Sequence, residues 1–322
     1  MWNFTIWDLK VLHRQIPDPQ IPDFSRHLCR PMYYVLYGLL YVLSLLPLRV
    51  LYLLSDLGFF IVYHLLGYRK EVVLANLRTA FPQKTEEERV RIARRFYYNF
   101  TDNFIESIKF ISAPPRFFEK HFTGDFSQVH ELWKDGRPVH FHVGHNFNWE
   151  LANLAMPRHL PGQLVAVYMP LHARAVDRLF YKIRSRFGTK LAAATRLGED
   201  MLPFRGQQYV FALIADQSPP VPSKAVWTRF FGQPTGFIRT PEAAARRNDY
   251  PVFFAHYTKK KRGYYEAHVE LATDHPRQLP EGELTKRYAN FLERVMSEHP
   301  ELWLWSHRRW KKAYSPEWKL VE

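Results

Sequence analysis

The sequence has little cysteine, because Cys29 is the single thiol among its 322 residues. One cysteine excludes a disulfide within the chain and a cysteine-based metal site, and it fits a reducing compartment. Acidic residues are also scarce, with 31 Asp and Glu against 45 Lys and Arg, which gives a net charge of +14. A balance this basic favours an anionic partner, which can be a nucleic acid, an anionic membrane or an acidic protein.

The chain also lacks a long uninterrupted apolar run. Residues 32–48 are 17 in number and carry no charge, whereas the second run, 50–66, is interrupted by Asp56 and His64. A spanning helix needs about 20 apolar residues, so the first run is at the lower limit. We expect an uncleaved anchor that spans the membrane or lies in one leaflet, and a buried helical hairpin is the alternative. The apolar region begins too late for a cleaved signal peptide.

Three segments follow from this reading. Residues 1–31 form a proline-interrupted N-terminal extension, residues 32–68 a helical region that anchors the chain, and residues 69–322 the large domain. Cys29 falls in the extension, away from the motifs described below, and we give it no role.

Apolar strands alternate with amphipathic helices from about residue 120 onward. Strands are predicted at 138–143, 163–168, 209–215, 227–231, 252–257 and 264–271, and helices at 146–155, 173–187, 241–247, 285–299 and from 303 onward. Upstream, helices are predicted at 71–80 and after Thr85, which forms a capping box with Glu88. The pattern predicts an α/β fold with a mostly parallel central sheet flanked by helices and a late antiparallel hairpin.

The most informative motif is His145 followed five positions later by Glu150, just after the predicted strand 138–143. A neutral imidazole can take a proton from a hydroxyl near pH 7, and a carboxylate on its other nitrogen holds the tautomer. Residues five apart on a helix point about 140° apart, so His145 must lie in the turn before the helix. Gly144 supports such a turn because glycine tolerates positive φ. The alternative is a capping or core histidine.

A metal site is a competing interpretation of the same segment, since His140, His142 and His145 have the spacing H-x-H-x-x-H. Such a site needs further His or Asp ligands, and no bridging carboxylate is evident in the sequence. We therefore expect no metal.

Two downstream motifs carry further polar residues. Asp216 and Gln217 end a very apolar predicted strand, where open α/β sheets place ligands, although a plain strand-end turn is the alternative. In the tail, tryptophans interleave with His307, Arg308 and Arg309. Arginines grip phosphate bidentately and tryptophans anchor at interfaces; the alternative is a final helix packed through its tryptophans.

These motifs together resemble the bacterial lipid A late acyltransferases, the lauroyl and myristoyl transferases of the lysophospholipid acyltransferase superfamily. The resemblance covers about residues 69–312. It rests on the segment 76–82, on His145 with Glu150, on Asp216-Gln217 with the segment 230–232, and above all on the tail segment 303–311.

The resemblance implies a glycerolipid acyltransferase-like fold and O-acyl transfer at the cytoplasmic face of the bacterial inner membrane, with no cofactor. The donor would be acyl–acyl carrier protein or acyl-CoA, and the acceptor a hydroxyl of an anionic acylated glycolipid such as a lipid A precursor. His145 would be the base, Glu150 would hold it, and Arg184 would stabilise the oxyanion, with Arg186 and Arg239 as further candidates. Substrate binding would fall to Asp216, Gln217, Arg239, His307, Arg308 and Arg309.

Other functions remain open at this point. The acceptor could be another lysolipid or an amino-acid lipid, or the protein could be a non-catalytic relative that only binds acylated lipid. A nucleic-acid-binding protein is the alternative from another class, but the apolar anchor and the lack of a binding motif argue against it. We expect no nucleic-acid partner, and a monomer.

Overall fold

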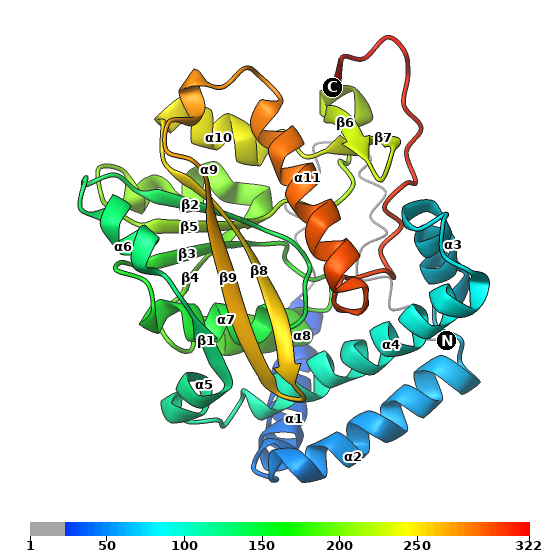
Figure 1. Ribbon diagram of the computed structural model, residues 1–322. Helices are drawn as coiled ribbons and strands as arrows, with labels where there is room; N and C mark the ends of the chain where they lie inside the picture. Colours follow the sequence, from blue (N-terminus) through cyan, green and yellow to red (C-terminus); the bar gives the residue numbers. More distant parts are fainter. Residues whose placement is uncertain (1–22) are drawn as a thin grey trace.

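The computed structural model describes residues 23–322, so the extension expected at 1–31 lies outside the described residues up to position 22. Its centre is a seven-stranded sheet with the strand order β1-β9-β8-β2-β5-β3-β4 (Figure 1). The strands are β1 (Phe122–Gly124), β2 (Val139–Val143), β3 (Leu164–Tyr168), β4 (Lys190–Ala193), β5 (Val210–Ile214), β8 (Val252–Lys261) and β9 (Tyr264–Thr273).

All neighbouring pairs in this sheet are parallel except β8 and β9, which form the expected antiparallel hairpin. A second small sheet has the order β10-β6-β7 and contains β6 (Val226–Phe230), β7 (Gln233–Phe237) and β10 (Leu320–Val321). The prediction of a mostly parallel sheet flanked by helices is confirmed. The short strands β1, β4, β7 and β10 were not predicted.

The described α-helices are α1 (Asp23–Ser44), α2 (Leu48–Phe59), α3 (Lys70–Ala80), α4 (Glu86–Lys109), α5 (Pro115–His121), α6 (Ser127–Trp133), α7 (Trp149–Ala155), α8 (Arg174–Arg184), α9 (Leu197–Asp200), α10 (Thr240–Asn248) and α11 (Glu283–Glu298). The capping box is confirmed, because Thr85 accepts from the Glu88 amide and Glu88 reaches back to the Thr85 amide. The helix predicted from Trp303 onward is wrong: a short 3₁₀ turn, Pro300–Leu302, precedes an irregular tail.

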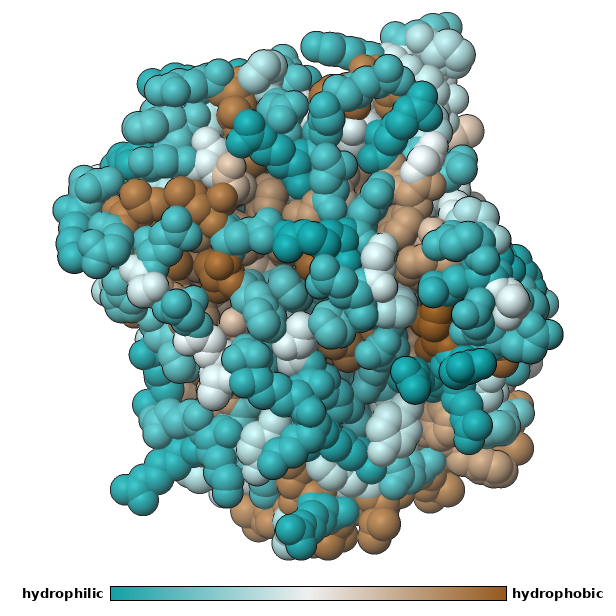
Figure 2. All heavy atoms as spheres, viewed as in Figure 1, coloured by the Kyte–Doolittle hydropathy of each residue, from teal (hydrophilic) through white to brown (hydrophobic). Residues whose placement is uncertain are grey.

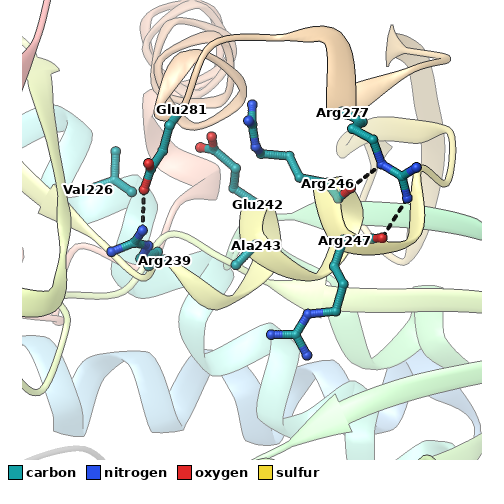
Figure 3. A pocket seen from close by; sticks show the side chains of 8 residues that line it. All are labelled: Val226, Arg239, Glu242, Ala243, Arg246, Arg247, Arg277 and Glu281. Carbon is teal, nitrogen blue, oxygen red and sulfur yellow. Dashed lines mark hydrogen bonds and ion pairs between the residues drawn. The ribbon is translucent and has the colours of Figure 1, made fainter.

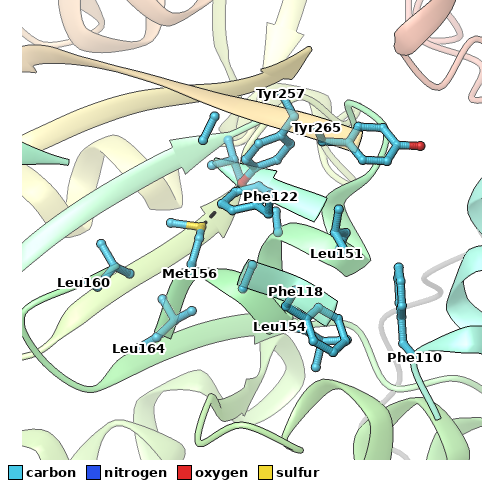
Figure 4. Close-up of a cluster of buried hydrophobic side chains, with 14 of the residues drawn as sticks. Phe110, Phe118, Phe122, Leu151, Leu154, Met156, Leu160, Leu164, Tyr257 and Tyr265 are labelled. Atoms are coloured by element: carbon cyan, nitrogen blue, oxygen red, sulfur yellow. Dashed lines mark hydrogen bonds between the residues drawn. The ribbon is translucent and has the colours of Figure 1, made fainter. Parts of the chain in front are cut away.

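Three apolar clusters of described residues lie against the sheet: a small one around Val165 of β3 and Phe211 of β5, and two large ones. One contains Phe141 and Val143 of β2 together with Leu151 and Leu154 of α7, and Figure 4 shows part of it. The other contains Phe254 of β8 and many side chains of α4 and α11. Because side chains alternate along a strand, β2 sends His140 and His142 to the face opposite Phe141. The sheet is therefore covered on both faces, as mostly parallel sheets usually are.

In the structure, the second of the two N-terminal apolar segments forms the longer apolar helix, which differs from the expectation that residues 32–48 are the candidate span. The apolar part of α1 extends over Met32–Ser44, which is shorter than a membrane span. By contrast, α2 continues into a π-helical segment, Phe60–Leu65, and the 18 residues Leu48–Leu65 are long and apolar enough to cross a membrane. Only 22% of that window is buried, so most of it faces outward.

Candidate active site

Strands β2 and β5 end side by side, and this brings His145 and Asp216 together. The strands are parallel, with Val143 paired to Ile214, so both residues lie two positions beyond the last pair. The Nδ1 atom of His145 lies 2.6 Å from Oδ1 of Asp216, and the backbone N–H of His145 donates to Oδ2 at 2.8 Å. The pair is thus held at the carboxyl edge of the sheet, where α/β folds place ligands.

The surroundings of Asp216 keep it ionised. Burial alone would raise the pKa of Asp216, but the His145 imidazole and donated hydrogen bonds outweigh it, so the pKa lies below its ordinary value. One of these bonds comes from the indole N–H of Trp303, which donates to Oδ2 at 2.7 Å. An ionised carboxylate only accepts, so Nδ1 of His145 carries the proton and Nε2 is the acceptor. The side-chain nitrogen of Gln217 lies 3.2 Å from this Nε2 and donates to it.

Glu150 occupies a place that its spacing from His145 did not predict. Helix α7 begins after Asn148, whose side-chain oxygen caps it by accepting from the Leu151 amide at 2.9 Å. Glu150 therefore lies in the first turn, where Nε of Arg184 donates to its Oε2 at 2.9 Å and Nη2 donates to Oε1. The carboxylate on Nδ1 of His145 is that of Asp216, which corrects the expectation that Glu150 holds the ring.

Arg184 lies on α8 and forms a two-point ion pair with Glu150. Burial disfavours the charge on Arg184, yet Glu150 outweighs this and raises the pKa of Arg184. About a quarter of its side chain is exposed, whereas Glu150 is buried. Helix α8 also contacts α1, because Arg178 lies over the Tyr33 ring at 4.4 Å and Lys182 over the Tyr37 ring at 3.9 Å. The helix that carries Arg184 is thus packed against an N-terminal apolar helix.

Gly144 is required for space and not for positive φ. It is absent from the positive-φ glycines of the described chain, which corrects the sequence argument. A Cβ at this position would lie 3.0 Å from Oδ1 of Asn146 and from Cδ2 of Leu292, and 3.3 Å from Oδ2 of Asp216. Any larger residue would therefore press on the carboxylate that orients His145.

The other two histidines of the motif are interior residues. His140 and His142 are both buried, and burial lowers the pKa of each to about 3. His142 packs against Phe254 and Tyr288 in the core that contains α11. Across residues 23–322, no group of three or more His, Cys, Asp or Glu residues is arranged to hold a metal ion.

The tail residues take different positions from one another. Arg309 is buried, donates to the Gly236 carbonyl at 2.9 Å and lies over the Phe237 ring. His307 is also buried; burial lowers its pKa to about 3, and its Nε2 accepts from the Ser218 amide. The observed contacts of these two residues are with the protein itself. Arg308 is exposed, so it is the residue of this group that faces outward.

The remaining candidate arginines are engaged elsewhere. Arg186 donates to the carbonyls of Phe110 and Ala113, which fixes the end of α4. Arg239 pairs with Glu281 in a cavity of about 320 Å³ beside α10 (Figure 3). The cavity is lined by Val226, Arg239, Glu242, Ala243, Arg246, Arg247, Arg277 and Glu281, and the His145 ring is not among these. These contacts leave Arg184 as the candidate arginine joined to the segment 145–150, through Glu150.

Sequence reasoning missed Trp303 as the donor that holds Asp216. The residue was noted only as an interface or packing tryptophan. Its backbone forms an antiparallel bridge with Asn146, next to His145, so the tail folds back onto the active-site turn. Nothing in the local sequence around either residue predicts this long-range contact.

The sequence of this chain matches a known protein family. A search of curated proteins found no match. The family model for the bacterial lipid A biosynthesis acyltransferases matches residues 21–312, which is most of the chain and includes every residue of the candidate site. The protein therefore belongs to the bacterial lipid A biosynthesis acyltransferase family and is an acyltransferase.

Proposed function

We propose that this enzyme transfers a fatty acyl chain from acyl–acyl carrier protein or acyl-CoA to a hydroxyl of an acylated glycolipid such as a lipid A precursor. The observation that carries this proposal is the hydrogen bond between Nδ1 of His145 and the ionised Asp216. That bond places the ring proton on Nδ1, so Nε2 is the basic nitrogen, and the acceptor hydroxyl would take the place of the Gln217 side chain beside it.

The reaction then needs one base and one oxyanion donor. Nε2 of His145 takes the proton of the acceptor hydroxyl, and the oxygen attacks the thioester carbonyl. The C–S bond breaks as the new ester forms, and the departing thiolate takes the proton from the imidazolium. Nε and Nη2 of Arg184 bond Glu150, which leaves Nη1 to stabilise the developing oxyanion. In this scheme Glu150 acts by positioning Arg184, while Asp216 orients His145.

The charge of the protein supports anionic substrates. Acyl carrier protein is acidic and lipid A precursors are phosphorylated, so a net charge of +14 favours both partners electrostatically. Gln217 lies at the reacting nitrogen, where it also can meet the acceptor hydroxyl. Arg308 and Arg239 are exposed and stay our candidates for contacts with phosphate or with the carrier protein. We propose a monomer that has no nucleic-acid partner.

The exposed apolar side chains support attachment to a membrane. They are concentrated on α1, α2 and the π-helical segment, and brown atoms gather at the lower edge of Figure 2, where Figure 1 draws these helices. The family is typically associated with the inner membrane. We propose that residues 32–66 attach the acyltransferase domain to the cytoplasmic face, because this face meets acyl carrier protein.

The test compares membrane lipids by mass spectrometry in a bacterial strain that lacks this protein. The strain is complemented with the wild-type chain, with His145→Ala, or with His172→Ala, whose exposed histidine lies outside the site. We expect a glycolipid that lacks one acyl chain, restored by the wild type and by His172→Ala alone. Restoration by His145→Ala would refute the proposal, as would an unchanged lipid profile in the deletion strain.

A further inference from the structure

Glu106 of α4 joins three parts of the molecule that are far apart in sequence. It is almost completely buried, with 1% of its surface exposed. Its Oε1 accepts from the hydroxyl of Tyr52 on α2 at 2.8 Å. Its Oε2 accepts from the side-chain amide of Asn148 at 2.6 Å and from the hydroxyl of Tyr265 on β9 at 2.9 Å. Burying a carboxylate costs free energy unless hydrogen-bond donors surround it, so an apolar side chain at this position would fill the same space at a lower desolvation cost.

Asn148 makes this contact from within the catalytic turn, residues 145–150, where it caps helix α7. Its side-chain oxygen is committed to the Leu151 amide as the cap of α7, which directs its nitrogen toward Glu106. The turn contains both His145 and Glu150. A displacement of Asn148 would therefore move the base and the carboxylate that positions Arg184 together.

The opposite end of the link belongs to the helix whose outer face is apolar. Leu51, Tyr52 and Ser55 of α2 are buried against the domain, whereas Leu53 and Leu57 are exposed. Figure 4 shows Tyr265 at the edge of the apolar cluster, with its ring oxygen directed away from the other labelled side chains. Tyr52 and Tyr265 therefore bring hydroxyls to Glu106 from an outward-facing helix and from the sheet, respectively.

Ionic contacts hold α2 in this position. The hydroxyl of Ser55 donates to Asp102 at 2.7 Å, and Arg262 bonds both Asp102 and Asp56 of α2. Lys259 completes the group by donating to Asp102 at 2.8 Å. Helix α2 is thus fixed to α4 and to the β8–β9 hairpin. A displacement of α2 would therefore also displace the hydrogen bonds at Glu106.

We propose that Glu106 is a positioning residue for acyl transfer, which couples the lipid-facing helix α2 to the catalytic turn through Tyr52 and Asn148. The inference rests on the proposed function in naming the reaction. The structural part of the inference requires only that the conformation of residues 145–150 depends on the hydrogen bonds at Glu106. Contact of α2 with a bilayer then favours the turn geometry in which Nε2 of His145 and Arg184 face the substrates.

Two tyrosine variants provide a matched pair for the test. Tyr52→Phe and Tyr265→Phe each remove one hydroxyl from Glu106 and retain the ring, but only Tyr52 lies on α2. We expect Tyr52→Phe to lower kcat about tenfold on substrate in anionic phospholipid vesicles, because the variant loses one buried hydrogen bond. Its KM should change less than about twofold. We expect the kcat of Tyr265→Phe to stay within about threefold of the wild type, because α2 keeps its bond.

Variants at Glu106 separate positioning from folding. Glu106→Gln keeps an oxygen for Asn148 and Tyr265, and its amide can donate to the Tyr52 hydroxyl, so it should retain most of the wild-type kcat. Glu106→Ala leaves three donors without acceptors and should lose kcat and stability together. Equal kcat for the wild type and Tyr52→Phe would overturn the inference, and so would equal losses in Tyr52→Phe and Tyr265→Phe.

A readout without turnover keeps this test independent of the proposed reaction. The imidazole ¹H–¹⁵N signals of His145, assigned with His145→Gln, should shift in Tyr52→Phe on vesicles and keep their wild-type positions in Glu106→Gln. Identical His145 signals in Tyr52→Phe and the wild type would refute the coupling even if the enzyme acylates some other acceptor. Absence of transfer by the wild type, with the shift present, would instead count against the proposed function alone.

Discussion

His145 and Asp216 lie 71 residues apart in sequence, yet the imidazole Nδ1 and the carboxylate Oδ1 are 2.6 Å apart. Oδ2 of the same carboxylate accepts from the His145 amide and from the Trp303 indole. Each oxygen therefore has a distinct role: one orients the ring, and the other fixes the carboxylate to the backbone and the tail.

Replacing Asp216 by Asn should fix the wrong tautomer of His145. The His145 amide and the Trp303 indole donate at the Oδ2 position, so they would keep the oxygen of the new asparagine there. Its NH₂ group would then face Nδ1 of His145 and force the ring proton onto Nε2. We expect kcat to fall about 10³- to 10⁴-fold with little change in stability, as when a histidine loses its orienting carboxylate. Steady-state kinetics with a thermal melt measures both, and a loss below about tenfold would contradict the assigned role.

Glu150 and Arg184 should behave as one unit. Glu150→Gln removes the charge that holds Arg184 and should preserve substrate binding while most of the turnover is lost. Arg184→Lys retains a charge but loses the two-point contact, because lysine cannot bond a carboxylate through a planar fork. The double variant should be hardly worse than either single variant, since both break the same contact. Additive losses in kcat would show that Glu150 acts by a route other than Arg184.

Adding a methyl group at position 144 should disturb the base. In Gly144→Ala the new Cβ lies within 3.0 Å of Asn146 and Leu292 and 3.3 Å from Asp216, so these neighbours must move. We expect kcat to fall about tenfold or more, because small misplacements of catalytic groups are costly. Gly198→Ala is the matched control, since no atom lies within 4 Å of its added Cβ. Equal activity of the two variants would contradict the packing argument.

The buried histidines should make the fold sensitive to acid. The pKa of His140 is lowered by burial to about 3, while an unfolded histidine titrates near 6.5. Between these values the unfolded chain binds more protons, so stability is complete above pH 6.5 and falls as pH decreases. The loss is about 1.4 kcal/mol per pH unit for each such histidine.

His140→Leu should flatten this dependence. We expect the free energy of unfolding of the variant to fall less between pH 6.5 and 5, by about one proton's contribution. His172→Leu, at an exposed position, should have the wild-type slope. Urea titrations at several pH values measure it, and identical slopes for His140→Leu and the wild type would contradict the prediction.

The outer face of α2 should bind lipid. Leu53 and Leu57 are 67% and 56% exposed, so Leu53→Glu with Leu57→Glu should leave folding intact. Burying a leucine is worth about 1.5–3 kcal/mol, so the pair should reduce the affinity for anionic vesicles by about tenfold or more. Leu202→Glu, at an apolar position 48% exposed outside the N-terminal helices, is the control in vesicle flotation. Equal flotation of both variants would refute a lipid-facing α2.

The sequence predicted the five longer strands of the central sheet, the hairpin and the position of His145 in the turn before α7, because these depend on local pattern. The partner of His145 depends instead on the order and register of strands, which place β5 next to β2 although β3 and β4 come between them in the chain. The same limit explains Trp303, whose aromatic surroundings favoured a helix until the tail's contact with Asn146 fixed it in extended form. Both the partner of His145 and the conformation of Trp303 depend on long-range contacts, which the local sequence does not predict.

The most direct test of the central claim is a single-turnover measurement of acyl transfer by purified His145→Gln. The variant preserves size and polarity at the site but cannot accept the hydroxyl proton. We predict that acyl transfer falls at least about 10³-fold while the affinity for donor and acceptor changes little, because the base acts in the chemical step. A rate within about tenfold of the wild type would contradict the account.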